Sequence, residues 1–185
     1  MFVRTQRLTL RPGWREDAPE LARAIGHESV VRNLARAPWP YTIEAAETFA
    51  GSFDRPEEPK FLIFEHHQGG LRLVGGMAVG PMENELHEFG YWITPDAWGR
   101  GYATEAGAAV LGAARAAGIR KVTARHFLDN PASGRVLRKL GFRPTGRVAP
   151  VYSRGRGAAA PSAQFEIDLA EAGTVDNDPR ARMAA

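Results

Sequence analysis

Two glycines, one residue apart, are the first feature of the sequence that could do chemistry. Gly99 and Gly101 stand in the stretch WGRGYATEA, between a strand-like segment and an alanine-rich segment with helical spacing. Backbone N–H groups of a glycine-rich turn point at a common centre, and the N-terminus of the following helix adds partial positive charge. The pattern predicts a site for a phosphate-bearing ligand. A tight turn into a helix, without a ligand, is the competing interpretation.

The spacing of these glycines disfavours two common nucleotide motifs. The P-loop pattern G-x-x-x-x-G-K-[ST] is absent from the chain. The dinucleotide pattern G-x-G-x-x-G would need a glycine where Thr104 stands, and no βαβ unit with a downstream acidic residue fits around it. Neither ATP nor NAD is therefore favoured as the ligand.

Polar side chains that could accept or donate protons lie on the strands before and after the turn. Glu88 lies on the strand before it and can act as a general base, whereas a solvated or salt-bridged residue is the competing interpretation. His126 ends the next strand, where a packing role competes with a role beside the substrate. Glu83 and Glu85 extend the acidic stretch near Glu88, which could attract a cationic amine or form a solvated edge. The sequence has no cysteine, which excludes disulfides, thiol catalysis and cysteine-ligated zinc, and we expect no metal site.

The elements that must position these residues follow from hydrophobic periodicity. Asp17 and Glu20 have the spacing of a capping box for a first helix, and Thr42 can cap another helix. Strands are expected at 2–11, 60–66, 71–80, 86–93, 121–127, 142–152 and 164–169, and helices at 17–26, 29–36, 42–53, 102–117 and 130–141, with a loop at 153–163. This order predicts an α+β domain with a central mixed, mostly antiparallel sheet of about six to seven strands flanked by helices.

Length and composition limit the number of domains, the partners and the compartment that we expect. A chain of 185 residues favours one domain, at residues 1–169, followed by a small, polar tail at 170–185 that we expect to be disordered. Lys and Arg number 24 against 21 Asp and Glu, and they are scattered rather than clustered, which disfavours a nucleic-acid partner. The N-terminus lacks the apolar region of a signal peptide, and no apolar run is long enough to span a membrane. We expect a cytoplasmic protein with no membrane partner.

Three segments, in order, resemble one family. The stretch PDAWGRGYATEA is similar to the pyrophosphate loop of the GNAT superfamily of N-acetyltransferases, [QR]-x-x-G-x-[GA], with Trp98 in place of the Gln or Arg. W-G-[KR]-G-Y-A-T-E-A is typical of the branch that resembles ribosomal-protein N-terminal acetyltransferases. TQRLTLRPGWREDAPEL and DNPASGRVLRKLGF resemble two further segments of that branch, so the likeness runs from Thr5 to Leu169.

The resemblance implies acetyl-CoA as the cofactor and assigns residues to it. Backbone amides of residues 98–104 would hold the pyrophosphate. The backbone of Tyr91 and Ile93, together with Asn130, would bind the pantetheine arm, and Arg138 or Lys139 would lie near the 3′-phosphate. The full set of expected cofactor residues is Tyr91, Ile93, Trp98, Gly99, Arg100, Gly101, Tyr102, Ala103, Thr104, Asn130, Ser133 and Arg138.

The resemblance also implies catalytic roles. Many family members carry a tyrosine in the second helix as the acid for the departing thiolate, but Leu137 stands in that position here. In the branch resembled, Ser133 is the implied substitute, and helix capping is its competing role. Glu88 is the expected base, through a bridging water. Acetyl transfer is expected to proceed by direct attack of an amine, without a covalent enzyme intermediate.

The pKa of the acceptor amine indicates which class of amine is the expected substrate. A lysine amine, with a pKa of about 10.4, costs about 4.6 kcal/mol to deprotonate at pH 7, whereas an α-amine costs only about 1 kcal/mol. A protein N-terminal α-amine is therefore the expected acceptor. A polyamine, amino acid or aminoglycoside is the alternative, and a non-catalytic acyl-CoA-binding module is the alternative class. The expected substrate side comprises Trp39, Tyr41, Glu88, His126 and Tyr152, in a monomer or homodimer.

Overall fold

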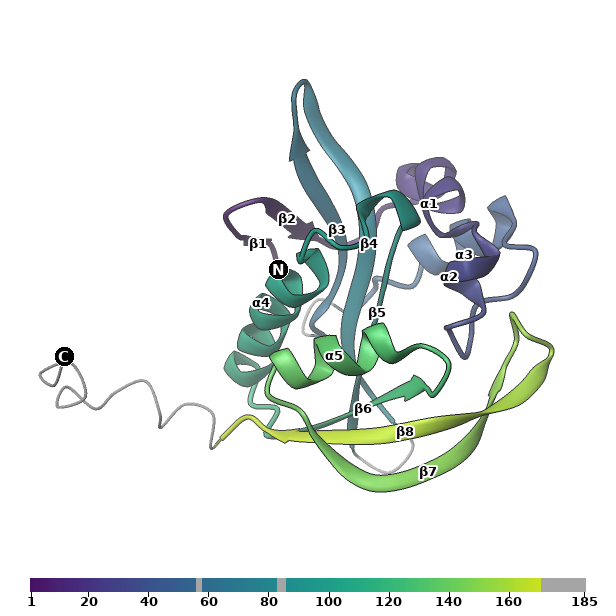
Figure 1. Ribbon diagram of the computed structural model, residues 1–185. Coiled ribbons are helices and arrows are strands. Elements are labelled where there is room, and N and C mark those ends of the chain that lie inside the picture. Colours follow the sequence, from purple (N-terminus) through teal and green to yellow (C-terminus); the bar gives the residue numbers. More distant parts are fainter. Residues whose placement is uncertain (56–57, 83–85, 171–185) are drawn as a thin grey trace, which may run out of the picture.

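The computed structural model describes residues 1–55, 58–82 and 86–170, which form one mixed sheet with helices on both faces (Figure 1). Within these ranges the sheet has eight strands in the order β1-β2-β3-β4-β5-β6-β8-β7. The strands are β1 Val3–Arg4, β2 Leu8–Arg11, β3 Lys60–His67, β4 Gly70–Pro81, β5 His87–Ile93, β6 Lys121–Phe127, β7 Arg143–Ser153 and β8 Ala158–Asp168. The helices are α1 Ala18–Ile25, α2 Glu28–Val31, α3 Ile43–Ala50, α4 Tyr102–Ala116 and α5 Pro131–Lys139, with short 3₁₀ turns at Arg15–Asp17 and Pro95–Ala97.

β5 and β6 form a parallel strand pair, and they are paired over only the first part of their lengths. β5 and β6 are joined by the crossover helix α4, as a parallel pair requires. They pair over three positions only, from His87 opposite Val122 to Phe89 opposite Ala124. β5 then continues to Ile93 along β4, and β6 continues to Phe127 along β8. The two strands therefore part in the middle of the sheet.

The two faces of the sheet carry separate hydrophobic cores. Phe89 and Ile93 of β5 pack with α4 and α5, in a core that includes Leu137. Trp92, between them, packs into the second core, with α1 to α3. Alternation along the strand thus divides β5, with Phe89, Tyr91 and Ile93 on one face and Glu88, Gly90 and Trp92 on the other.

The strands differ from expectation at both ends of the chain, in number at the N-terminal end and in length at the C-terminal end. The segment expected as one strand at 2–11 is two strands, since Thr5 N–H bonds back to Leu8 O at 2.9 Å and reverses the chain. The expected loop at 153–163 contains most of β8, because Ala158 to Ala163 pair with β7 and gain their hydrogen bonds from it. The expected helix at 29–36 is shorter, covering Glu28–Val31.

The capping box expected for α1 is wrong. Asp17 accepts hydrogen bonds from both Arg11 guanidinium nitrogens, at 2.7 Å each, and from Trp14 N–H at 2.7 Å. Glu20 accepts from Leu73 N–H of β4 at 2.9 Å. Both carboxylates therefore tie α1 to its surroundings instead of capping it. The expected cap of α3 is confirmed, with the Thr42 hydroxyl accepting from Ala45 N–H at 3.3 Å.

The sequence predicts a disordered tail at 170–185 and no segment that spans a membrane. Residues 171–185, most of the expected tail, lie outside the described residues, as do Glu83 and Glu85. Throughout the described ranges, every helix is too short or too polar to cross a membrane.

Candidate active site

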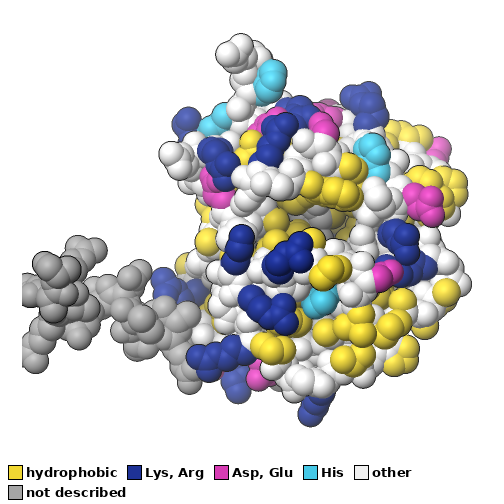
Figure 2. Space-filling model, in the orientation of Figure 1, with side chains coloured by type: hydrophobic (Ala, Val, Ile, Leu, Met, Phe, Trp, Pro, Cys, Tyr) yellow, Lys and Arg dark blue, Asp and Glu magenta, His cyan; other side chains and the backbone are white. Residues whose placement is uncertain are grey.

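A cavity of about 630 Å³ opens where β5 and β6 part. Figure 2 shows it as a hollow with hydrophobic side chains inside and basic side chains beside it. Consecutive residues of β5, from Glu88 to Ile93, line the cavity although they alternate between the two faces. The cavity therefore reaches both faces of the sheet, and its volume suits a drug-sized or cofactor-sized ligand.

The glycine turn forms one end of the cavity wall. Gly99 and Gly101 have φ angles of 75° and 80°, in the left-handed region that favours glycine. Gly101 is the N-cap residue of α4, and no side chain caps the helix. The N–H groups of Tyr102 and Ala103, at the start of α4, have no partner within the helix, whereas Thr104 N–H donates to Gly101 O at 3.1 Å, and all three residues line the cavity. Backbone donors at an uncapped helix start fit a pyrophosphate group.

Trp98 attaches this turn to β5. Its indole Nε1 donates to Ile93 O at 2.7 Å, while the residue as a whole is half exposed. The tryptophan that replaces the Gln or Arg of the family pattern thus anchors the turn to the strand end. One lone pair of the Ile93 carbonyl, expected to serve the pantetheine arm, is occupied by this bond.

Side chains from the N-terminal strands hold the other side of the turn. Arg7 Nη1 donates to Arg100 O at 2.9 Å, and Arg7 Nε donates to Glu105 Oε2 at 2.7 Å. Thr5 Oγ1 donates to the second Glu105 oxygen at 2.6 Å. Burial alone would raise the pKa of Glu105, but these hydrogen bonds and the Arg7 charge outweigh it, and the pKa is lowered. Sequence reasoning missed these roles, although all three residues lie in the segments that carry the resemblance.

A buried carboxylate fixes the side chain of Arg100. Glu65 is 4% exposed, accepts from Arg72 Nε at 2.6 Å and lies 3.3 Å from Arg100 Nη1. Arg72 also pairs with Asp96, in the turn before the glycines. Burial would raise the pKa of Glu65, but the Arg72 and Tyr102 hydrogen bonds and the two guanidinium charges lower it overall. The Arg100 side chain therefore points to Glu65, and it does not line the cavity.

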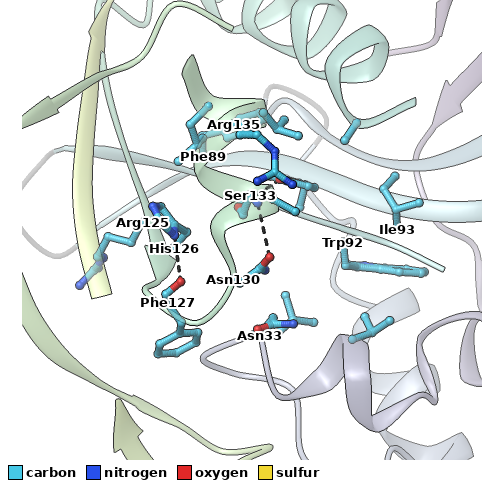
Figure 3. Close-up of a pocket in the computed structure, with 18 of the residues that line it drawn as sticks. Asn33, Phe89, Trp92, Ile93, Arg125, His126, Phe127, Asn130, Ser133 and Arg135 are labelled. Carbon is cyan, nitrogen blue, oxygen red and sulfur yellow. Dashed lines mark hydrogen bonds between the residues drawn. The ribbon is translucent and has the colours of Figure 1, made fainter. Parts of the chain in front are cut away.

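Two hydroxyls meet on the α5 side of the cavity. Tyr91 OH, from β5, donates to Ser133 Oγ, from α5, at 3.0 Å. Burial raises the pKa of Tyr91, and the bond to Ser133 offsets this in part. Asn130 caps α5 through its side chain, which accepts from Ser133 N–H at 3.4 Å (Figure 3). The capping role that competed for Ser133 thus belongs to Asn130, and all three residues line the cavity.

Glu88 lies on the opposite face of β5 and is paired. Its Oε1 accepts from Arg125 Nε of β6 at 2.8 Å, and both side chains line the cavity. The two interpretations of Glu88 hold together, since it is salt-bridged and lies at the cavity. The second carboxylate oxygen, Oε2, lies outside this ion pair.

His126 lines the cavity from beneath α5. Its ring Nδ1 donates to Phe127 O at 2.9 Å, and its ring lies 5.4 Å from that of Phe165. A Cβ placed on Gly134 would be 2.7 Å from His126 Nε2, so α5 approaches the ring closely. The ring therefore has a packing role on the same face as Tyr91 and Ser133.

Besides Arg100, four expected site residues are not brought to the cavity. Trp39 and Tyr152 are exposed, and Tyr41 packs on the α1–α3 core, where burial raises its pKa to about 12. Arg138 donates to Gly134 O at 3.3 Å and lies over the Phe165 ring. Sequence spacing placed these four residues near the site, but none of them lines the cavity.

The cavity also has lining residues that were not expected. Lys139, the alternative to Arg138 for the 3′-phosphate, lines the cavity together with Arg135, which was not expected there. Figure 3 shows Asn33 across the cavity from Arg135. The wall on that side comes from α2 and the segment after it, through Ser29, Val30, Asn33, Leu34, Ala35 and Arg36. Sequence reasoning missed this wall, because no pattern marks a short helix as facing a cavity 55 or more residues away in sequence.

A cavity between two parting parallel strands, with a glycine turn at a helix start, fits an enzyme that binds a phosphate-bearing cofactor, and comparison with known proteins identifies the class. The sequence profile of the acetyltransferase (GNAT) domain matches residues 7–143. The chain therefore belongs to the GNAT acetyltransferase family. It is an N-acetyltransferase that uses acetyl-CoA.

Relatives agree with this assignment. The uncharacterized N-acetyltransferase YoaA of Bacillus subtilis (strain 168) is 27% identical over 149 residues, covering 78% of this chain and 84% of YoaA. A GNAT-family acetyltransferase from Bacillus anthracis superposes with a TM-score of 0.76, at 21% identity over 92% of this chain and 99% of that chain. RimL, the ribosomal L7/L12 alpha-N-protein acetyltransferase solved with coenzyme A, superposes with a TM-score of 0.71, at 18% identity over 91% and 98% of the two chains.

Proposed function

We propose that the protein acetylates the N-terminal α-amine of a protein by direct attack of that amine on bound acetyl-CoA. The observation that carries the proposal is the division of the cavity between two sheet faces. The glycine turn and Ser133 lie on the α4–α5 face, and Glu88 lies on the opposite face, beside the wall from α2. A thioester and an amine can therefore enter from opposite faces and meet at the sheet.

The proposed cofactor contacts follow from this division. The N–H groups at the start of α4 would hold the pyrophosphate, and Arg135 and Lys139 would face the remaining phosphate. Asn130 and the free edge of β5 beyond Phe89 would bind the pantetheine arm, as an added strand would. The bound thioester supplies the acetyl group and leaves as a thiolate, beside Ser133.

Glu88 is the proposed base. Arg125 holds its carboxylate at the cavity, and the oxygen outside the pair can accept a proton through a water. An α-amine needs little help to deprotonate at neutral pH, about 1 kcal/mol, so a relayed carboxylate suffices. The absence of cysteine excludes an acyl-cysteine intermediate and fits the reducing cytoplasm, the proposed compartment.

A small-molecule amine is the second candidate acceptor. The open mouth formed by α2 and by Val151 of β7 would admit a polyamine, an amino acid or an aminoglycoside as readily as a peptide end. RimL, whose name states an alpha-N-protein substrate, shares the fold, which favours the protein N-terminus.

A panel of peptides and amines, read by mass spectrometry, tests the acceptor. We expect acetylation of free peptide N-termini and none of N-terminally blocked peptides that contain lysine. Modification of lysine side chains alone, or of small amines alone, would overturn the choice of a protein N-terminus as the acceptor.

The substitution Glu88→Gln tests the proposed base. It should lower turnover by roughly 10- to 100-fold, the low end for a general base. Glu166→Gln, exposed on β8 and outside the cavity, is the matched control and should leave turnover unchanged.

A further inference from the structure

A pair of hydroxyls lies at the cavity where the family resemblance leads one to expect a single acid. Tyr91 and Ser133 are 42 positions apart in sequence, yet their oxygens are 3.0 Å apart. Both residues line the cavity and come from rigid elements, β5 and α5. Leu137, one helical turn further along α5, is 1% exposed and has no proton to give.

The direction of the hydrogen bond leaves one proton unassigned. A hydroxyl has one proton and two acceptor lone pairs. Tyr91 gives its proton to Ser133 Oγ, so the Ser133 proton must point elsewhere. Among the described residues, the bond from Tyr91 is the one hydrogen bond in which Ser133 Oγ takes part. The Ser133 proton is therefore available to a ligand in the cavity.

We infer that Tyr91 and Ser133 form a proton relay to the sulfur of coenzyme A, with Tyr91 as the proton source and Ser133 as the group in contact with the sulfur. The inference rests on the proposed placement of Ser133 beside the thioester. It gives the side chain of Tyr91 a catalytic role, whereas the resemblance implied only a backbone contact.

With the relay, every bond and proton in the acetyl transfer is accounted for. The amine nitrogen forms the new C–N bond, and the C–S bond breaks with its electron pair on sulfur. Sulfur takes the Ser133 proton, and Ser133 takes the Tyr91 proton. The proton that leaves the amine nitrogen goes to Glu88 or water, and the tyrosinate then recovers one proton from solvent. The products are an amide and a neutral thiol, with the enzyme unchanged.

A phenol suits this role better than a serine alone. The ordinary pKa of tyrosine is about 10 and that of a thiol about 8.5, so the transfer is uphill by about 1.5 units at these ordinary values. Burial raises the pKa of Tyr91, which keeps its proton in place at neutral pH and adds to the uphill cost. A chain of two hydrogen bonds offsets part of this cost, because each bond strengthens the other. Serine would supply the contact and tyrosine the acidity.

The thiol of bound coenzyme A tests the relay without any acceptor. Because the chain has no cysteine, that thiol is the one thiol in the complex. Its pKa can be measured from the rate of alkylation by iodoacetamide across pH. In the wild-type complex it should lie below that of free coenzyme A. Tyr91→Phe and Ser133→Ala should each raise it by about one unit, a 10-fold loss of thiolate at fixed pH.

Two further variants separate a relay from a structural role. Tyr91→Phe with Ser133→Ala should equal Ser133→Ala alone, because the relay is in series. Ser52→Ala, which removes an exposed hydroxyl outside the cavity, should change nothing. Coenzyme A affinity should stay within about twofold in every variant, and turnover of Tyr91→Phe should fall about 10-fold with an unchanged KM.

Contrary outcomes are distinct for each proposal. An unchanged thiol pKa in Tyr91→Phe, or effects of the two substitutions that multiply, would overturn the relay and leave the acetyltransferase assignment intact. A shifted thiol pKa without acetylation of any peptide N-terminus would overturn the acceptor and leave the relay.

Discussion

We expect cofactor binding to depend more on Gly101 than on any other single backbone position. Its φ of 80° lies in the left-handed region, and it is the N-cap of α4, whose first residues line the cavity. A non-glycine residue there costs roughly 1–2 kcal/mol, and a β-branched residue costs more. The nearest neighbour of an added Cβ would be Arg7 Nη2, at 3.5 Å, so backbone strain rather than collision is the obstacle.

Gly101→Val should therefore weaken acetyl-CoA binding at least 10-fold, measured by calorimetry, as the turn relaxes away from its φ. Gly112→Ala is the matched control, since Gly112 lies within α4 with open space around it. It should leave affinity unchanged and raise the unfolding free energy by up to about 1 kcal/mol. Equal affinity of wild type and Gly101→Val, with an intact fold, would refute the pyrophosphate site.

At the scale of elements, the N-terminal hairpin and α4 act as one unit. The turn between β1 and β2 presents Thr5 and Arg7 to Glu105, in the first turn of α4. Arg7 also reaches Arg100 O, in the glycine turn. The hairpin thus fixes the direction in which the N–H groups of α4 point.

Glu105→Gln should lower acetyl-CoA affinity several-fold, although Glu105 does not line the cavity. The amide keeps one acceptor oxygen but loses the charge that holds Arg7, so the turn gains freedom. Fluorescence titration with coenzyme A measures the change. Glu47→Gln, exposed on α3, is the control and should bind as wild type does. If the two variants bound equally, the hairpin would have no role in positioning the turn.

The packing of α5 on β6 is a second element-scale feature. A Cβ on Gly134 would meet the His126 ring at 2.7 Å, and that ring is held by Phe127 O and Phe165. Ser133 precedes Gly134 directly, so any shift of α5 displaces the hydroxyl pair.

Gly134→Ala should lower turnover about 10-fold and reduce stability by about 1–3 kcal/mol, the usual cost of overpacking. Adding His126→Ala removes the obstructing ring and should restore a large part of both losses. Steady-state kinetics and urea unfolding of the single and double variants measure the coupling. If the double variant were no better than Gly134→Ala, the ring would not set the position of α5.

The whole molecule depends on buried carboxylates that stay charged. The pKa of Asp17 is lowered, because hydrogen bonds from Arg11 and Trp14 outweigh the effect of burial. The pKa values of Glu65 and Glu105 are lowered in the same manner. These groups lie in three regions, near α1, β3 and α4, so protonation loosens both faces of the sheet.

A lowered folded-state pKa sets the sign of the pH dependence. Each contribution is complete above the unfolded-state pKa, about 4–4.5, and is lost as pH falls through the folded-state pKa. The unfolding free energy should be flat near neutrality and fall below about pH 4.5, by up to about 1.4 kcal/mol per pH unit for each group. Urea unfolding across pH measures this. Glu65→Gln should flatten the decline relative to the exposed control Glu47→Gln, and parallel declines would contradict it.

Features that depend only on the local backbone could be predicted from the sequence. Gly99 and Gly101 mark a left-handed turn, and alternation along residues 86–93 divides β5 between two faces, because both depend on neighbouring residues only. The order of elements and three spaced segments then indicated the family. The last strand, by contrast, was underestimated, because alanines at 158–160 become a strand only through pairing with β7.

The tertiary structure alone decided which side chains meet. The contacts of Tyr91 with Ser133, Glu88 with Arg125 and Arg7 with Glu105 join residues 37 to 98 positions apart. Capping and exposure likewise depend on what packs nearby, which moved Asp17 from a helix cap to an ion pair with Arg11. The sequence by itself indicated a phosphate-bearing ligand, since a glycine turn and a helix start suffice to bind a phosphate, and three spaced segments indicated acetyl-CoA. Only the folding of distant strands and helices onto one sheet brought the proposed proton donors, the proposed base and the wall from α2 around one cavity.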